Sequence, residues 1–355
     1  MNEIIKVWNT NSLCYFFIFS LTITIMMMMT TPSISIEKSG ITIKNHYAYA
    51  SPPSLYPASA VTLADFNFAA VGDWGCTSDT IDTVKNIMDK DPELVLAIGD
   101  LSYNSSAKCW LEMIEPIANK TKIAIGNHET DSIKKLKNYM EFFELKKQYY
   151  SFNYENVHFT VISTELPYEG GSEQYNFVNN DLSKVSSDPS IDWIVVYFHS
   201  LAYTSPADTG KGNRAEKELR ETYHPLFDKY DVDLVLQAHN HNYQRSYPII
   251  FNNDNPKNPI ITDDNTNNNN NYYDPEGQIF VTAGTGGASV YPLTGQADYV
   301  ATQYIGFGFL NVDVINDDDG GTTTLSGKFY TNNGGTTIKD QFTTTKSDIT
   351  NENDM

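Results

Sequence analysis

The chain has 355 residues, of which 40% are hydrophobic and 19% charged, with 24 Lys and Arg against 44 Asp and Glu. This composition is typical of a folded protein with one large core or two modest ones. The formal net charge of −20 argues against nucleic-acid binding, which depends on Lys and Arg to neutralise phosphates. An anionic substrate would also need local cations, such as metal ions, to hold it.

Residues 1–30 are predicted to be a signal peptide or an N-terminal membrane anchor. No charged residue lies between Val7 and Ile36, and Leu13–Met29 is almost wholly apolar. The length of this run falls between that of a signal-peptide core and that of a transmembrane helix. Both destinations therefore stay open: a secreted protein, or a membrane-anchored protein that faces the outside of the cell. Residues 31–64, rich in Ser, Thr and Pro, are predicted to be a linker.

The catalytic domain is predicted over residues 65–345, and its first part alternates strand-like with helix-like segments. Short apolar runs broken by polar or glycine-rich turns are typical of buried parallel strands; they lie at Phe68–Val71, Leu94–Ile98, Ile123–Ile125, Ile194–Phe198 and Leu234–Ala238. Amphipathic helices are predicted at Thr77–Lys90, Ser132–Leu145, Glu173–Val185 and Asn213–Tyr230. Such alternation indicates an α/β fold in which helices cover the sheets.

The last third of the chain is predicted to be mainly strands. Residues 252–273 are rich in asparagine and are predicted to be a flexible surface loop. Strands are then expected at Gln278–Ala283, Gly308–Val314, Thr322–Tyr330 and Thr336–Phe342. The last three alternate polar with apolar residues, which favours an antiparallel sheet with one wet face. Residues 346–355 are predicted to be a disordered tail.

Polar side chains that could bind metal follow five of the predicted strands. The carboxyl ends of such strands meet at one edge of the sheet, where open α/β sheets bind ligands. Carboxylate, amide, imidazole and phenol groups together suit hard or borderline divalent and trivalent metals. Seven ligands are too many for one tetrahedral site and suit two ions that share a carboxylate, about 3.5–4 Å apart. These candidates are Asp73, Asp100, Tyr103, Asn127, His199, His239 and His241.

Three further residues have predicted roles beside these ligands. His128 lies next to Asn127 and could protonate a leaving group, the usual role of a histidine general acid. Cys76 and Cys109 are the two cysteines outside the N-terminal segment. In an exported protein such a pair suggests a disulfide bond, with two free buried thiols as the alternative.

The order of these motifs resembles the calcineurin-like metallophosphoesterases. The motifs are Asp73-x-Gly75, Gly99-Asp100-x-x-Tyr103, Gly126-Asn127-His128-Glu129, His199 and His239-x-His241. Most of that superfamily has Asp-x-His in the first motif. Gly75 in that place, together with Tyr103, resembles the purple acid phosphatase branch.

The resemblance implies a fold and a set of metal ligands. The implied fold is α/β (α+β), a four-layer αββα sandwich of two mixed β-sheets flanked by helices. Asp73, Asp100, Tyr103 and His241 would hold Fe(III), and Asp100 would bridge the two ions. Asn127, His199 and His239 would hold a second ion, Fe(II), Zn(II) or Mn(II), and His128 would contact the substrate.

The expected function is that of an exported acid phosphatase-like hydrolase. It would cleave a small phosphate monoester by in-line attack of a metal-bound hydroxide. One alternative is a metal-dependent phosphodiesterase with the same ligands and no Fe(III). Tyr103 favours the phosphatase, because a phenol is a poor ligand for divalent ions that are weaker Lewis acids. A second alternative, from outside the enzymes, is a surface-anchored binding protein that retains the fold.

Overall fold

The computed structural model describes residues 33–37, 40–44, 64–205, 217–264, 269–316, 322–333 and 337–347. It divides into two units, Met1–Ala60 and Val61–Met355. In the first unit β1 (Ser33–Glu37) and β2 (Gly40–Lys44) pair as an antiparallel hairpin, within residues predicted to be linker. The signal or anchor predicted at residues 1–30 lies outside the described residues. None of the described helices combines the length and the apolar character that a bilayer span requires.

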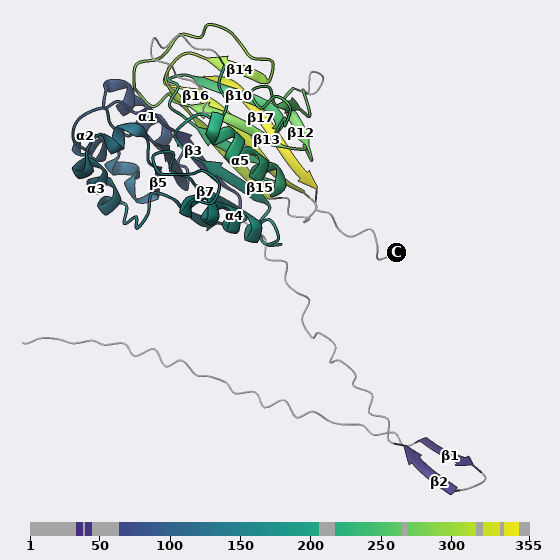
Figure 1. Cartoon of the computed structure of the whole chain (residues 1–355). Coiled ribbons are helices and arrows are strands. Elements are labelled where there is room, and N and C mark those ends of the chain that lie inside the picture. Colours follow the sequence, from purple (N-terminus) through teal and green to yellow (C-terminus); the bar gives the residue numbers. More distant parts are fainter. Residues whose placement is uncertain are drawn as a thin grey trace, which may run out of the picture. The chain divides into compact units, whose positions relative to one another are not determined.

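The second unit contains two mixed β-sheets (Figure 1). The described strands of one sheet run in the order β11 (Ile260–Ile261), β10 (Tyr243–Ile250), β13 (Gln278–Ala283), β9 (Leu234–Gln237), β8 (Trp193–Tyr197), β7 (Val157–Val161) and β6 (Tyr150–Tyr154), with β14 (Val300–Tyr304) also paired to β10. Those of the other run in the order β12 (Asn271–Tyr273), β17 (Ile338–Ser347), β16 (Thr322–Thr331), β15 (Gly308–Asn316), β3 (Phe66–Val71), β4 (Leu94–Ile98) and β5 (Thr121–Ala124). We call these the β10 sheet and the β3 sheet.

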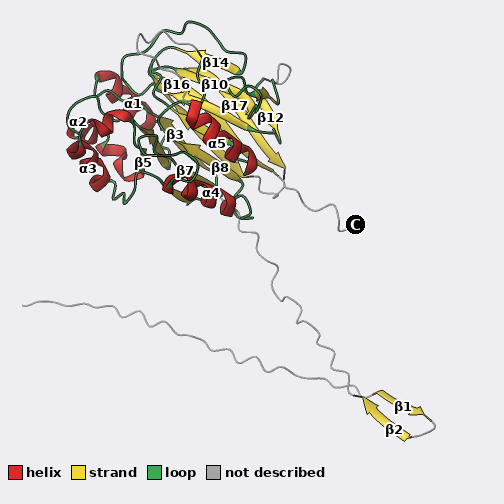
Figure 2. Cartoon of the chain, in the orientation of Figure 1, coloured by secondary structure: helices red, strands yellow, loops and turns green. Residues whose placement is uncertain are grey.

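Helices cover the outer face of each sheet (Figure 2). Strand β3 shows the pattern, because successive side chains of a strand point to opposite faces. Phe68 and Ala70 face the core between the sheets, whereas Ala69 and Val71 face the helices. The helices over the β3 sheet are α1 (Ser78–Met88), α2 (Lys108–Met113) and α3 (Ile133–Phe142), and those over the β10 sheet are α4 (Glu173–Val185) and α5 (Lys217–Lys229). The predicted αββα sandwich is confirmed.

The predicted parallel strands agree with the observed pairing. Strands β3, β4 and β5 are parallel to one another, as are β7, β8 and β9, and β15 to β17 are antiparallel as predicted. Three strands of the second unit extend into segments predicted to be loop or tail. Strands β11 and β12 lie inside the segment predicted to be a flexible loop, because both pair with neighbouring strands. Strand β17 continues to Ser347, past the predicted start of the disordered tail, because it pairs along its length with β16.

A buried ion pair joins the two sheets within the core. Arg245 of β10 donates from Nε and Nη2 to both carboxylate oxygens of Asp340 on β17, at 2.6 and 3.0 Å. Arg245 also donates to the Tyr272 hydroxyl of β12, at 3.2 Å. Buried charges are tolerated when they are paired and hydrogen-bonded, and this bidentate geometry is the favourable one for Arg and a carboxylate.

A second polar cluster attaches helix α4 to the β10 sheet. The Asp181 carboxylate of α4 accepts hydrogen bonds from Ser151 Oγ at 2.7 Å and Thr160 Oγ1 at 2.8 Å, and its Oδ2 lies 3.0 Å from His158 Nε2. Burial alone would raise the pKa of Asp181, but these contacts outweigh it and lower the pKa below its usual value.

Replacing Asp181 with Asn is expected to lower the free energy of unfolding by about 2 kcal/mol near neutral pH. The deficit should shrink as the pH falls below the ordinary aspartate value of 3.8. The contribution of a carboxylate with a lowered folded-state pKa is present above the unfolded pKa and is lost as pH falls through the folded one. Urea unfolding at a series of pH values measures this difference.

The control is Asp82→Asn, which removes an exposed carboxylate of α1 and should change stability by less than about 0.5 kcal/mol. A deficit for Asp181→Asn that stays constant into acid would contradict the prediction, because ionisation would then contribute nothing.

Candidate metal centre

The predicted ligands lie just beyond the ends of five parallel strands. Asp73 follows β3, Asp100 follows β4 and Asn127 follows β5, all in the β3 sheet. His199 follows β8 and His239 follows β9, both in the β10 sheet. Tyr103 and His241 lie in the same loops as Asp100 and His239. Each sheet therefore contributes ligands from its carboxyl edge, as the strand pattern predicts.

The backbone is strained at three of these ligands. Asp73, Asp100 and His239 have φ values of 57°, 47° and 64°, in the left-handed region that costs a residue with a side chain about 1–2 kcal/mol. Such strain is typical of functional sites, where the surrounding structure holds a residue in an unfavourable conformation. Here it turns the chain sharply at the strand ends.

Two glycines let the ligand loops approach one another. A Cβ atom on Gly99, whose φ is 73°, would lie 2.8 Å from the His199 imidazole. A Cβ atom on Gly126 would lie 2.5 Å from the Asp100 backbone nitrogen. No side chain fits at those distances, so the glycines of the two motifs are explained by close packing around Asp100 and His199.

One group of predicted metal ligands surrounds the Tyr103 hydroxyl, and we call it the Tyr103 group. This oxygen lies 2.8 Å from Asp73 Oδ1, 3.3 Å from Asp100 Oδ2 and 2.7 Å from His241 Nε2. His241 Nδ1 lies 2.6 Å from the carbonyl oxygen of Ser289. Because a carbonyl only accepts, Nδ1 carries the proton in that contact and Nε2 faces the site.

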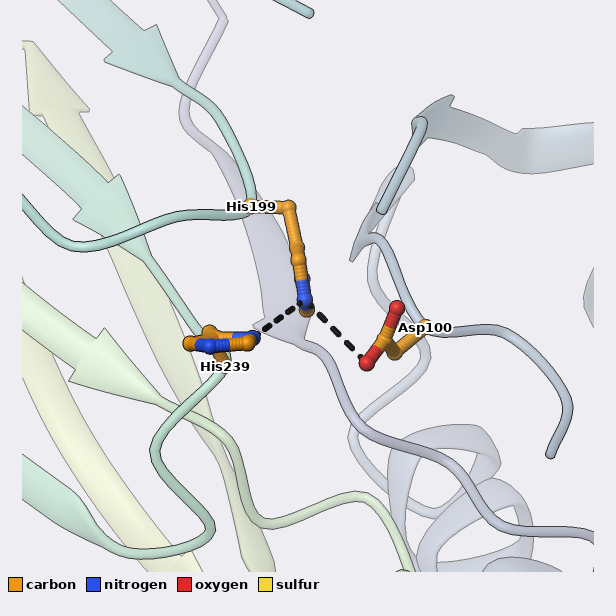
Figure 3. Close-up of side chains that lie close together, drawn as sticks. All are labelled: Asp100, His199 and His239. Atoms are coloured by element: carbon orange, nitrogen blue, oxygen red, sulfur yellow. Dashed lines mark hydrogen bonds and ion pairs between the residues drawn. The ribbon is translucent and has the colours of Figure 1, made fainter. Parts of the chain in front are cut away.

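A second group consists of Asp100, His199 and His239 (Figure 3). His199 Nε2 lies 3.2 Å from Asp100 Oδ2 and 3.2 Å from His239 Nδ1, and one ligand atom from each of the three residues lies within 4.8 Å of the others. His199 Nδ1 is 2.9 Å from the Ile98 carbonyl oxygen, so this ring also presents Nε2 to the site. Asp100 Oδ2 thus belongs to both groups.

Asn127 and His128 come from the loop after β5. Among the described residues, the buried Asn127 Oδ1 has no hydrogen-bond partner, which is unusual for a buried amide oxygen. The His128 side chain is 32% exposed. Its Nδ1 lies 3.0 Å from Asp131 Oδ2, and its ring centre lies 4.2 Å from that of Tyr103. His128 therefore lies against Tyr103 and is in part accessible to solvent.

The charges of the site shift one another's pKa values. Burial would raise the pKa of Asp73, but the His241 imidazole outweighs it and holds that pKa below its usual value. Burial would lower the pKa of His199, but the Asp100 carboxylate raises it to about 10. For Tyr103, burial and the two aspartates together raise the phenol pKa far above its usual value. Without a cation the phenol keeps its proton, whereas a strongly Lewis-acidic ion bound to its oxygen would lower the phenol pKa.

This donor set fits metal ions. It combines two buried carboxylates, three imidazoles, a phenol and an unpartnered amide oxygen, a mixture that suits hard and borderline metals. The described residues form a single cluster of at least three His, Cys, Asp or Glu side chains able to hold a metal, and that cluster is Asp100, His199 and His239. The family resemblance assigns Asp73, Tyr103 and His241 to an ion beside it.

The predicted disulfide bond is absent. Cys76 and Cys109 are free thiols. They are neighbours nonetheless, because burial and a hydrogen bond with Cys109 raise the pKa of the Cys76 thiol to about 12. A thiol with so high a pKa is a poor nucleophile at neutral pH. The structure therefore has two free thiols, as in the alternative, but both are part-buried and not fully buried.

The structure adds one residue to the site. The Tyr291 ring stacks on His241, with ring centres 4.0 Å apart and planes at 10°, and the Tyr291 N–H donates to the His241 carbonyl oxygen at 3.0 Å. Its place in the sequence, four residues after the glycine-rich segment 284–287, gave no signal of this contact.

Comparison with known proteins agrees with these motifs. A family model for calcineurin-like phosphoesterases matches residues 66–243, half of the chain. Purple acid phosphatase 22 of Arabidopsis thaliana is 30% identical over 234 residues, which cover 60% of this chain and 51% of that protein. Phosphoenolpyruvate phosphatase of Allium cepa is 25% identical over 264 residues, 67% of this chain and 51% of that protein. The chain thus spans about half the length of these curated relatives.

Solved structures show the same fold. Purple acid phosphatase PPD1 from yellow lupin (Lupinus luteus) seeds superposes with a TM-score of 0.66 and 25% identity, over 80% of this chain and 54% of that chain. GAP50, the anchor in the inner membrane complex of Plasmodium, has a TM-score of 0.58 and 15% identity, over 78% of this chain and 87% of that chain. The second likeness concerns the fold alone. The chain belongs to the calcineurin-like phosphoesterase family and is similar to the purple acid phosphatases within it.

Proposed function

We propose that this protein is an exported phosphatase that hydrolyses small phosphate monoesters with two metal ions. The observation that carries the proposal is the position of Asp100 Oδ2, which lies within 3.3 Å of both the Tyr103 hydroxyl and His199 Nε2. One carboxylate oxygen therefore belongs to two donor groups, as a bridging ligand must. Similarity to the purple acid phosphatases supports the same activity.

The residues divide between the two proposed ions. Asp73, Tyr103 and His241 would hold Fe(III) together with Asp100, because a phenol binds well only when a strong Lewis acid deprotonates it. Asn127, His199 and His239 would hold Fe(II), Zn(II) or Mn(II). When bound, such a pair neutralises charge on the phosphoryl oxygens and activates water for attack on phosphorus. In a chain with a net charge of −20, these cations would also offset the repulsion of an anionic substrate.

His128 is proposed to protonate the leaving oxygen of the substrate. Its ring is part-exposed, and Nε2 lies 3.9 Å from Asp100 Oδ2, so it reaches both the donor groups and solvent. The Asp131 carboxylate 3.0 Å from Nδ1 accepts the Nδ1–H and orients the ring, as the carboxylate of a catalytic histidine pair does. The proton given to the leaving oxygen would be the one that the imidazolium form carries on Nε2.

The two alternative functions are less well supported. A phosphodiesterase that uses only Mn or Zn does not explain why a part-buried phenol lies between Asp73 and His241. A binding protein without activity would not require all seven predicted ligand residues, and none of them is missing from this chain.

Purified protein is expected to absorb visible light and to hold about two metal ions per chain. The band should vanish in Tyr103→Phe, because it arises from charge transfer between tyrosinate and Fe(III). Tyr154→Phe, which changes a tyrosine of β6 in the other sheet, should keep it. Absorption spectra and metal analysis of the three proteins test this.

The two contrary results have different meanings. A colourless wild-type protein with two Mn or Zn ions would contradict the proposed phosphatase activity and favour the phosphodiesterase alternative. A protein without metal after expression in metal-replete medium would contradict metal-dependent catalysis of either kind.

His128→Gln is expected to lower kcat by about 10²–10⁴-fold on an alkyl phosphate. The loss should be much smaller on p-nitrophenyl phosphate, because a good leaving group departs without a proton. His158→Gln changes a histidine of the α4 cluster and should show no dependence on the leaving group. Equal losses on both substrates for His128→Gln would mean that His128 binds phosphate rather than donates a proton.

Export is proposed from the charge-free segment between Val7 and Ile36. In the native host, the protein is expected in the medium or on the outer cell surface, accessible to protease added to intact cells. N-terminal sequencing distinguishes a cleaved signal from a retained anchor. Recovery only from the soluble interior of the cell would contradict export.

A further inference from the structure

Two buried charged residues outside the ligand set connect the loops that hold Asp100 and Asn127. Glu129 lies in the short 3-10 helix η2 (Asn127–Asp131) and is 0% exposed, and Lys135 lies in α3 and is 1% exposed. We call residues 100–103 the Asp100 loop and residues 126–128 the Asn127 loop. Neither charged residue is used in the mechanism above, and charges this deeply buried are rare unless they have defined partners.

Glu129 binds one backbone N–H from each loop. Its Oε1 accepts from Leu101 N and its Oε2 accepts from Gly126 N, both at 2.9 Å. Leu101 directly follows Asp100, and Gly126 directly precedes Asn127. Both oxygens of one carboxyl group therefore act as acceptors, one for each loop.

Lys135 makes the reciprocal connection through backbone carbonyls. Its Nζ donates to the His128 carbonyl oxygen at 2.8 Å and also to the Ser102 carbonyl oxygen. One buried carboxyl group therefore binds N–H groups of the two loops, and one buried lysine binds their C=O groups. The loops also contact each other directly, because His128 N donates to Asp100 Oδ1 at 2.9 Å and the His128 ring lies 4.2 Å from the Tyr103 ring.

We infer that Glu129 and Lys135 are positioning residues that fix the distance between the Asp100 loop and the Asn127 loop, and with it the fit of the second metal ion. The inference rests on the proposed two-metal function. Asp73, Asp100, Tyr103 and His241 contact one another directly, whereas the second ion needs Asn127 at a fixed distance from Asp100. Loss of either charged residue should thus release the second ion and leave the first in place.

The test compares Glu129→Gln with the wild type and with Asp181→Asn. Glutamine keeps the shape of Glu129 but turns one acceptor into a donor, which then faces a backbone N–H. Metal titration should show the second ion bound about 10- to 100-fold more weakly, the usual effect of losing a group that orients ligands. The visible band of Tyr103 should persist. Asp181→Asn removes a comparable hydrogen-bonded carboxylate from the α4 cluster and should bind both ions as the wild type does.

A second readout needs no metal. Hydrogen exchange of the Leu101 and Gly126 amides in the metal-free protein should be faster in Glu129→Gln than in wild type, and unchanged in Asp181→Asn. Lys135→Met keeps an apolar stem of similar length without the cation, and should also weaken the second ion while the band remains. If Glu129→Gln does not fold, Lys135→Met alone tests whether the second ion is bound more weakly while the first remains.

The outcomes separate this inference from the proposed function. Two ions bound to Glu129→Gln or Lys135→Met with wild-type affinity would overturn the inference and leave the phosphatase intact. Parallel loss of both ions, or failure of both variants to fold, would also overturn it, because the two charges would then support the domain as a whole. A wild-type protein without metal would overturn the proposed function itself.

Discussion

Attraction between carboxylates of one sheet and imidazoles of the other governs the architecture around the site. Asp73 and Asp100 belong to loops of the β3 sheet, and the histidines that face them at 3.2 Å, His241 and His199, belong to loops of the β10 sheet. Neither set would be stable in a buried position alone, because a buried charge without a partner costs several kcal/mol. The left-handed backbone at Asp73, Asp100 and His239 and the glycines at 99 and 126 allow the loops to come this close.

The rest of the domain provides the favourable interactions that offset the unfavourable ones at the site. Strained ligands and buried Glu129 and Lys135 all oppose folding by themselves, and a large apolar core between the sheets offsets them. The Arg245–Asp340 pair and the Asp181 cluster attach strands and a helix well away from the ligands. This distribution is typical of enzymes, in which active-site residues are kept for chemistry at a cost in stability.

The strand ends could be predicted because each parallel strand is a short apolar run that stops at a polar motif, as at Leu94–Ile98 before Gly99-Asp100. Residues whose partners are distant in the sequence could not. Strand β10 contains Gln244, Arg245 and Ser246, which look like a loop until Asp340, 95 residues further on, explains how Arg245 is buried. Strand β12 looked like part of an asparagine-rich loop because its pairing with β17 is invisible in composition. Lys135 lies in the predicted amphipathic helix Ser132–Leu145, and the helix pattern does not indicate its burial, since the carbonyls that hold it belong to other loops. Tyr291 gave no signal because stacking on His241 depends on how a glycine-rich loop folds back.

The supply of ligands from two sheets has a consequence for how the protein acquires its metal. Asp73, Asp100, Tyr103 and Asn127 lie in the segment 73–127, and every imidazole of the donor groups lies in the later segment 199–241. During synthesis the oxygen ligands are therefore made before the nitrogen ligands, and neither segment alone offers the complete coordination shell of either proposed ion. Metal insertion becomes a late event that follows the docking of the sheets, and the compartment in which that docking is completed decides which ions the newly made chain encounters.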